Sequence, residues 1–122
     1  MILVDTSVWA DHFRSADAEL EALLAEAQVL VHPFVIGELA LGNLRERDTT
    51  LGALTSLPMA MKADDSELLG FVEAAAVFGR GIGLVDAHLL ASARLTPGSA
   101  LWTRDKRLAS IAAELDVAYA VG

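Results

Sequence analysis

The chain opens with Met1-Ile2-Leu3-Val4-Asp5-Thr6-Ser7, and this stretch, residues 1–7, decides the fold class. The short apolar run from Ile2 to Val4 predicts a buried strand. Asp, Thr and Ser all favour helix N-termini, so a helix is predicted to follow and to run to Arg14. A strand that passes directly into a helix is the first half of a βα unit, which belongs in a parallel sheet covered by helices.

The same alternation continues along the chain. Helices are predicted near 17–27, 33–41, 48–57, 66–78, 86–95 and after 105, and further strands near 29–31, 59–61, 100–102 and 117–121. The fold class is therefore α/β, a three-layer α/β/α sandwich with a central parallel sheet of four or five strands. A length of 122 residues fits one domain, residues 1–122, with no second core.

Composition narrows the chemistry. There is no Cys, so a disulfide framework, a thiolate nucleophile and a Cys-bound zinc are excluded. The net charge of −8 argues against binding nucleic acid by bulk attraction, and such binding would need local bases or a bound metal. The longest stretch without Asp, Glu, Lys or Arg, 49–61, is too short to span a membrane. We expect a cytoplasmic protein, because the N-terminus does not have the pattern of a signal peptide.

Four acids occupy positions where α/β proteins place their chemistry. Asp5 and Asp105 follow predicted strands, and the working crevice of an open parallel sheet lies beyond the carboxyl ends of its strands. Asp86 is expected to cap the helix that it precedes. A helix cap is the simpler interpretation of each of these aspartates taken alone. Glu38 differs, because it lies on an apolar helix and is predicted to be a buried carboxylate in need of a cation.

A divalent cation shared by these acids would satisfy Glu38. Oxygen ligands without a cluster of His or Cys suit Mg²⁺, with Mn²⁺ as the alternative. A carboxylate cluster that holds such ions is typical of phosphodiester hydrolysis, because the ions activate water and stabilise the phosphate in the transition state.

Four segments resemble the four motifs of PIN-domain ribonucleases, and in particular the VapC toxins of bacterial toxin–antitoxin pairs. These segments are 1–9, 35–39, 83–87 and 101–108, in family order over essentially the whole chain. The resemblance implies Mg²⁺-dependent cleavage of RNA, a homodimer, and inhibition by a VapB-type antitoxin. It implies an acidic cluster with a hydroxyl group that orients water or a carboxylate. The matching residues are Asp5, Glu38, Asp86, Asp105 and Thr103, with Asp5 and Asp86 the leading metal ligands and Asp105 a third.

Several residues near these motifs have two interpretations. Arg80, Arg104, Lys106 and Arg107 could contact RNA or could simply be solvated. His88 is predicted to lie at the surface or in an interface rather than to bind a metal. Trp9 and Trp102 are expected to belong to the core rather than to stack on bases.

Two other classes of protein compete with a nuclease. A phospho-acceptor receiver domain has a similar length and order of elements, but 59–61, taken as its middle strand, is followed by Lys62 and not by an acceptor aspartate. A PIN-like scaffold that binds RNA or a partner without cutting it is the other alternative, and the four intact acids argue against it.

Overall fold

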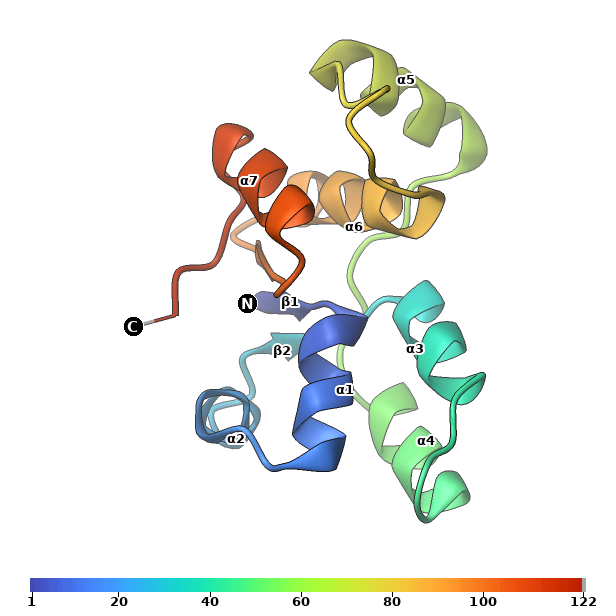
Figure 1. The fold of residues 1–122 in the computed structure, drawn as a ribbon, viewed down its shortest axis with the longest axis vertical. Helices are drawn as coiled ribbons and strands as arrows, with labels where there is room; N and C mark the ends of the chain where they lie inside the picture. Colours follow the sequence, from blue (N-terminus) through green and yellow to red (C-terminus); the bar gives the residue numbers. More distant parts are fainter. Residues whose placement is uncertain (122) are drawn as a thin grey trace.

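The computed structural model describes residues 1–121 of the chain. Within them, the sheet consists of β1 (Ile2–Val4), β2 (Val29–Leu30) and β3 (Ala100–Trp102), all parallel, in the order β2-β1-β3 (Figure 1). Leu3, in the central strand, lies opposite Leu30 on one side and Leu101 on the other. The predicted α/β class and the parallel sheet are confirmed.

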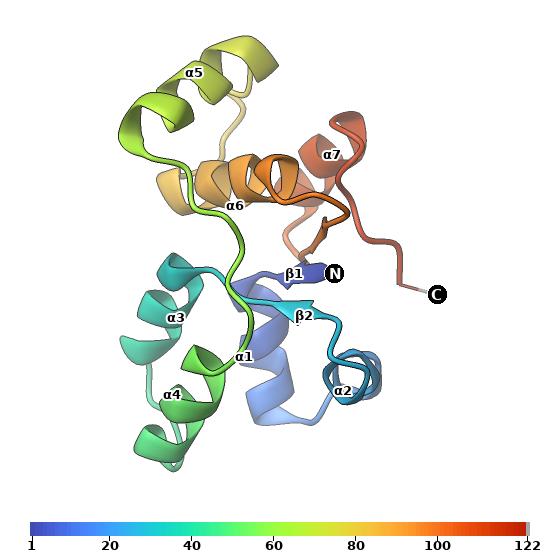
Figure 2. The same cartoon turned by 180° about the vertical axis from the view of Figure 1, so that it is seen from behind.

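Helices cover both faces of this sheet. Figures 1 and 2 show α1, α3 and α4 on one face and α6 and α7 on the other, with α5 packed outside α6. Their bounds are α1 Thr6–Arg14, α2 Ala18–Ala25, α3 Pro33–Ala40, α4 Arg47–Thr55, α5 Asp65–Ala75, α6 Leu84–Leu95 and α7 Lys106–Glu114. None of the helices described in residues 1–121 has the length and apolar composition to span a membrane.

The two predicted edge strands shrink to single bridges, Val31 with Met59 and Leu101 with Ala118. At the first edge, the N–H of Met61 turns away from the sheet and donates to the Thr96 hydroxyl at 2.9 Å, so the ladder stops there. At the other edge, β3 itself ends at Trp102 and offers little further strand to pair with. The prediction of four or five strands is therefore not confirmed: the described chain has three strands with one bridge on each side.

The core joins the sheet to helices on both of its faces. Leu3 and Val4 have no exposed surface, which is expected of a central strand covered on both sides. Trp9 and Trp102 are 3% and 4% exposed, so their predicted place in the core is confirmed. The helical residues packed in this cluster include Val8, Leu20, Val35, Leu89, Leu90, Leu108 and Ile111.

Most helix starts follow the side-chain capping rules. Asp17 accepts from the N–H of Leu20 at 2.9 Å, and Asp64 forms a reciprocal capping box with Glu67. The start of α6 differs from the prediction. The cap residue is Gly83, and Asp86 lies in the first turn, inside the helix. Asp86 is therefore not the N-cap residue that was predicted, because the helix begins two residues earlier, at Leu84. Its side chain still contacts the start of the helix, since it accepts from the N–H of Gly83 at 3.4 Å.

Candidate active site

The register of the sheet brings the ends of β1 and β3 together. Val4 lies opposite Trp102, and the N–H of Asp5 donates to the carbonyl oxygen of Trp102 at 2.9 Å. The residues that follow these two strands, Asp5 and Thr103, are therefore neighbours. They lie at the carboxyl edge of the sheet, where the sequence analysis expected the site.

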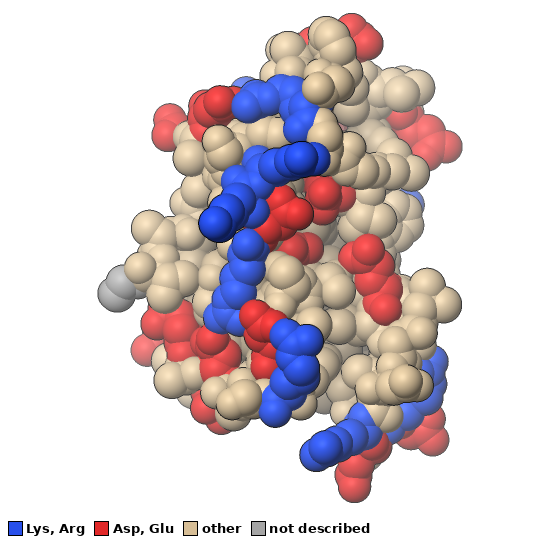
Figure 3. All heavy atoms as spheres, viewed as in Figure 1, with Lys and Arg blue, Asp and Glu red and all other residues tan. Residues whose placement is uncertain are grey.

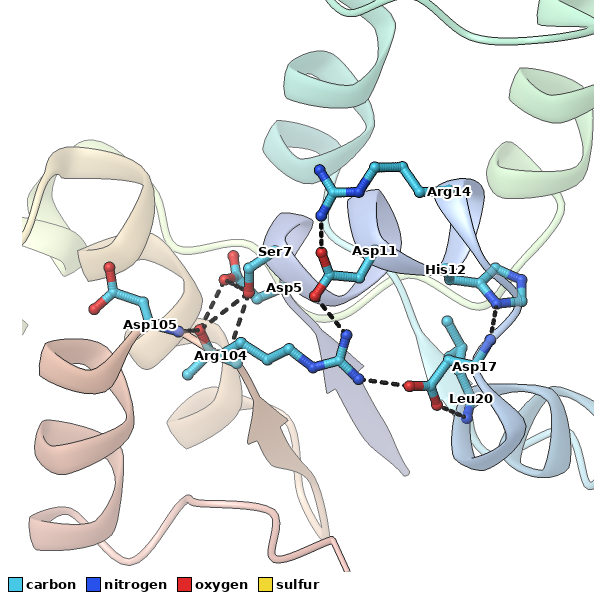
Figure 4. Close-up of polar contacts among 10 residues, drawn as sticks. Asp5, Ser7, Asp11, His12, Arg14, Asp17, Leu20, Arg104 and Asp105 are labelled. Atoms are coloured by element: carbon cyan, nitrogen blue, oxygen red, sulfur yellow. Dashed lines mark hydrogen bonds and ion pairs between the residues drawn. The ribbon is translucent and has the colours of Figure 1, made fainter.

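Asp5 is buried, with only 6% of its surface exposed. Its Oδ2 accepts hydrogen bonds from Ser7 Oγ at 2.7 Å and Thr103 Oγ1 at 2.8 Å (Figure 4). It stands at the N-cap position of α1, but its side chain makes no capping hydrogen bond. The simple cap interpretation therefore fails for Asp5, whose carboxylate is instead held by two hydroxyl groups at the end of the sheet.

Asp105 is exposed and does act as a cap. Its Oδ1 accepts from the N–H of Leu108 at 3.0 Å, and its own N–H donates to Thr103 Oγ1 at 3.1 Å. Thr103 therefore contacts Asp5 through its proton and Asp105 through its oxygen. One hydroxyl group connects two of the four predicted acids.

Asp86 is half-buried at the start of α6. Burial is the largest cause that raises its pKa above the usual value, and a hydrogen bond from the N–H of Gly83, at 3.4 Å, opposes the rise. Repulsion from three neighbouring carboxylates raises the pKa further. They are those of Asp5, Asp105 and Glu38. The fold thus brings the other three predicted acids within electrostatic range of Asp86.

Glu38 reaches this edge from α3, but it is not buried. The side chain is exposed, and its Oε1 accepts from Thr6 Oγ1 at 2.6 Å. The prediction of a buried carboxylate was wrong because the core stripe of α3 is formed by Val35 and Leu39, and Glu38 points beside it. It lines a cavity of about 570 Å³ bordered by residues of α1, α3, α4 and the α3–α4 loop.

The donor set fits a hard divalent cation. It consists of carboxylate and hydroxyl oxygens, the ligands that Mg²⁺ and Mn²⁺ prefer. No ion pair in the described chain engages any of the four acids, since all four recorded pairs lie elsewhere. Within residues 1–121, however, no three side chains of His, Asp or Glu stand close enough to enclose one ion. The four carboxylates are neighbours rather than a closed ligand cage.

Arg104 ties the β3–α7 loop to α1 and to the start of α2. Its Nη1 donates to Asp11 at 2.7 Å and its Nη2 to Asp17 at 2.5 Å (Figure 4). The hydrogen bond from Arg104 is the largest cause that lowers the pKa of Asp11. Because its guanidinium group is committed to these two carboxylates, the structure favours a structural role over the RNA contact considered from the sequence.

His88 was expected at the surface or in an interface rather than as a metal ligand, and its expected exposure was wrong. It is 3% exposed, and its ring packs edge-on against Phe34 with centroids 4.7 Å apart. His32, which is fully buried, lies beside it at 6.0 Å between ring centroids. His88 lies on the face of α6 that packs against the core. Its spacing of two residues from Asp86 predicted that it faces away from that acid, but not whether the opposite face is buried.

Thr6 and Ser7 also contact the acids, although they were not predicted as site residues. Thr6 donates to Glu38, and Ser7 donates to Asp5 and accepts from the N–H of Arg104 at 3.1 Å. Both had been interpreted as helix-capping residues. The available signal was the run Asp5-Thr6-Ser7, with two hydroxyl groups beside a strand-end acid.

Comparison with known proteins agrees with this fold. The PIN domain family model matches residues 2–114, and the chain belongs to the PIN-domain family. It is also similar to Ribonuclease VapC32 of Mycobacterium tuberculosis. The proteins of strains H37Rv and CDC 1551 are each 49% identical to it over 120 residues, which cover 98% of this chain and 97% of theirs.

The order of the strands corrects one expectation about a receiver domain. Residues 59–61 were taken as the middle strand, whereas β1, which is followed by Asp5, lies in the middle of the sheet. Strand order alone therefore does not separate the two classes, and membership of the PIN-domain family does.

Proposed function

We propose that this chain is a metal-dependent endoribonuclease, the toxin of a VapBC-type toxin–antitoxin pair, which hydrolyses RNA phosphodiester bonds. The observation that carries the proposal is that carboxylates from three separate elements, those of Asp5, Glu38 and Asp105, lie within electrostatic range of Asp86, and that no cation of the described chain is paired with any of the four acids. Membership of the PIN-domain family and the similarity to a ribonuclease support it.

Asp5, Asp86 and Asp105 would supply oxygen ligands to the cation, Mg²⁺ or alternatively Mn²⁺, together with water molecules, because these side chains do not by themselves enclose an ion. When bound, the cation supplies an activated water and the positive charge that stabilises the phosphate in the transition state. This positive charge also answers the objection that a protein of net charge −8 would repel RNA.

The surrounding hydroxyl groups orient the acids. Ser7 and Thr103 both donate to Oδ2 of Asp5 and so fix one oxygen of that carboxylate. Thr103 accepts from the N–H of Asp105 and thereby holds the backbone of this third acid close to Asp5. Supporting hydrogen bonds of this kind keep ligands in a productive geometry.

Glu38 stands on the exposed side of the cluster. Thr6 donates to its Oε1, so one oxygen of the carboxylate is held toward α1. We propose that Glu38 is a catalytic residue that accepts a proton at the open, solvated side of the site. Its exposure fits this role, because an exposed carboxylate can exchange a proton with the solvent.

Cleavage of a labelled RNA in Mg²⁺ tests the function. We expect the wild type to cut, and Asp5→Asn and Asp86→Asn to lose cleavage and toxicity to growing cells. Asp116→Asn is the matched control: it removes the same charge beyond the end of α7, where φ is +60° and Asn is well tolerated. Full cleavage by both site variants would refute the metal-nuclease proposal and favour a PIN-like scaffold that only binds.

We further propose that residues 1–122 form a single domain that works in the cytoplasm, where its RNA substrate and a VapB-type antitoxin are made. An antitoxin of this type would neutralise the enzyme by covering the acidic edge of the sheet. We expect a small reading frame directly upstream in the same operon, and its co-expression with this chain, followed by purification of a complex, tests the partner.

A homodimer is the expected assembly. Large apolar side chains remain exposed around α5 and the start of α6: Leu69 is 67% exposed, Phe78 60% and Leu84 66%. A second copy of the chain would cover such surface. Light scattering at micromolar concentration tests this, and the mass of a monomer would contradict it.

A further inference from the structure

The few basic residues of this acidic protein are unevenly placed. The chain has nine Lys and Arg against 17 Asp and Glu. Figure 3 shows many of the Lys and Arg side chains in a band over α7 and α1, beside a group of carboxylates on the same face. Such a band could guide an RNA strand past the acids, provided that its cations are not already neutralised by the protein.

Four basic residues were considered as RNA contacts from the sequence, and two of them are neutralised by acidic partners. Arg104 is bound by Asp11 and Asp17. Arg80 forms two hydrogen bonds with Glu114, at 2.5 and 3.1 Å. Neither guanidinium group is therefore available to a phosphate without first breaking an ion pair.

Lys106 and Arg107 differ from these two. Neither forms an ion pair with any residue between 1 and 121, and both are exposed in the first turn of α7. Ser110 lies four and three residues beyond them, on the same side of the helix. The three residues line a cavity of about 270 Å³ together with Arg80 and Ile111, here called the Arg107 pocket.

Gly81 holds Arg107 in place. Nη1 of Arg107 donates to the Gly81 carbonyl oxygen at 3.5 Å. Gly81 has a φ of +79°, and a Cβ at this position would lie 2.6 Å from Nη1. Glycine adopts this backbone conformation without strain, and a larger residue here would also displace the flexible end of the Arg107 side chain. The Gly79–Gly83 loop thus seats the guanidinium group with a carbonyl and not with a carboxylate, so its charge is not cancelled.

We propose that the Arg107 pocket binds a backbone phosphate of the RNA, next to the phosphate that is cut. This inference rests on the proposed function. Two uncancelled cations and a hydroxyl group are the chemistry that recognises a phosphate. The pocket is also adjacent to the acids, because Asp105 is the residue directly before Lys106 and caps the same helix. An RNA strand that reaches the acids would pass the pocket.

Continuity with the acidic site favours RNA over an acidic protein segment as the occupant. A strand of RNA presents phosphates at regular intervals, so one phosphate at the acids places its neighbours nearby. The local positive charge also meets a need of this protein, whose net charge of −8 gives no general attraction for RNA.

RNA binding tests the pocket separately from cleavage. In a background of Asp86→Asn, a labelled single-stranded RNA of mixed sequence is titrated in Mg²⁺ over a range of salt concentrations. The double variant Lys106→Gln/Arg107→Gln is expected to bind about tenfold more weakly. The negative slope of log K against log salt is expected to become shallower by about 1.4, or about 0.7 for each lost contact. In the active enzyme the loss is expected in KM.

Arg94→Gln is the matched control for each single variant, Lys106→Gln and Arg107→Gln, since it removes one positive charge near the end of α6, about 12 Å along the helix from Asp86. A second variant, Gly81→Ala, keeps both positive charges but displaces the guanidinium group of Arg107, and it should also weaken RNA binding. Circular dichroism and melting curves identify any variant that fails to fold.

Unchanged RNA affinity and salt slope in the folded double variant would overturn the inference. So would unchanged RNA binding together with weaker binding of the antitoxin, because the pocket would then serve the protein partner. A wild type that binds RNA through the pocket but never cuts it would refute the proposed function and leave the phosphate site standing.

Discussion

The hydroxyl group of Thr103 donates a hydrogen bond of 2.8 Å to Oδ2 of Asp5, although 98 positions separate the two residues in the chain. The parallel pairing of β1 with β3 makes this contact possible, because it sets Val4 opposite Trp102. The orientation of the most buried acid of the site therefore depends on the strand at the other end of the chain.

We expect Thr103→Val to lower kcat by about 10- to 100-fold with little change in folding. The substitution keeps the shape of the side chain but removes both the donor to Asp5 and the acceptor for the N–H of Asp105. Thr103→Ser keeps the hydroxyl group and should retain most of the activity. Equal activity of the Val and Ser variants in a cleavage assay would show that the hydroxyl group has no part in the reaction.

A double-mutant cycle should detect the tie formed by Arg104. We expect Arg104→Gln and Asp17→Asn each to lower the melting temperature by a few degrees, and the coupling between them to be no more than about 1 kcal/mol, because the pair is partly exposed. The Asn side chain can still cap α2, so the cycle isolates the ion pair. Additive losses would mean that the two side chains do not stabilise each other.

RNA binding by the Arg104→Gln variant distinguishes a structural Arg104 from an RNA contact. A structural tie predicts that RNA affinity at saturating Mg²⁺ and its dependence on salt are unchanged in Arg104→Gln at a temperature where the variant is folded. If the negative slope of log K against log salt became shallower by about 0.7 in Arg104→Gln, Arg104 would instead contact a phosphate.

Local patterns were sufficient to predict most elements of this fold. The apolar run before Asp5 predicted β1, and Asp17 and Asp105 marked the starts of α2 and α7 because their side chains cap. The edge strands could not be predicted from their β-forming residues alone. Their pairing depends on distant groups, such as the Thr96 hydroxyl that takes the N–H of Met61.

The site shows the same division between local and distant information. The positions of Asp5 and Asp105 followed from strand ends, but the exposure of Glu38 depends on which face of α3 meets the core. His88 was misplaced for a similar reason, because its burial depends on His32 and Phe34, which come from another part of the chain. Helical spacing defines the faces of a helix, and tertiary packing decides which of them is covered.

Acid should destabilise this protein through His32. The imidazole is fully buried, and burial, with repulsion from His88 and Lys62, lowers its pKa to about 4. The unfolded chain takes up a proton near pH 6.5 and the folded chain only near pH 4, so the free energy of unfolding falls as the pH drops through this window, by up to about 3 kcal/mol.

His32→Asn tests this contribution. Asn can accept the N–H of Phe34, as Nδ1 of His32 does, and it cannot be protonated in this range. The variant should be less stable at pH 7 because of the cavity it leaves, but the difference from wild type should shrink toward pH 4 in chemical denaturation. Parallel pH curves for the two proteins would contradict the prediction.

The last prediction concerns the repulsion among the four acids. The folded pKa of Asp86 is raised by burial and by its acidic neighbours, so the folded state binds its proton more tightly than the unfolded state does. The contribution of this group to stability therefore falls as the pH rises above the ordinary carboxyl value. In EDTA at pH 7, we expect Asp86→Asn to be more stable than wild type by on the order of 1 kcal/mol, or about 4 °C in melting temperature. The gain should vanish near pH 4, and added Mg²⁺ should stabilise the wild type more than the variant. Asp116→Asn, which lies away from the cluster, should show neither effect. If Asp86→Asn melts clearly below wild type in EDTA at pH 7, its carboxylate serves the start of α6 through Gly83 and stores no repulsion.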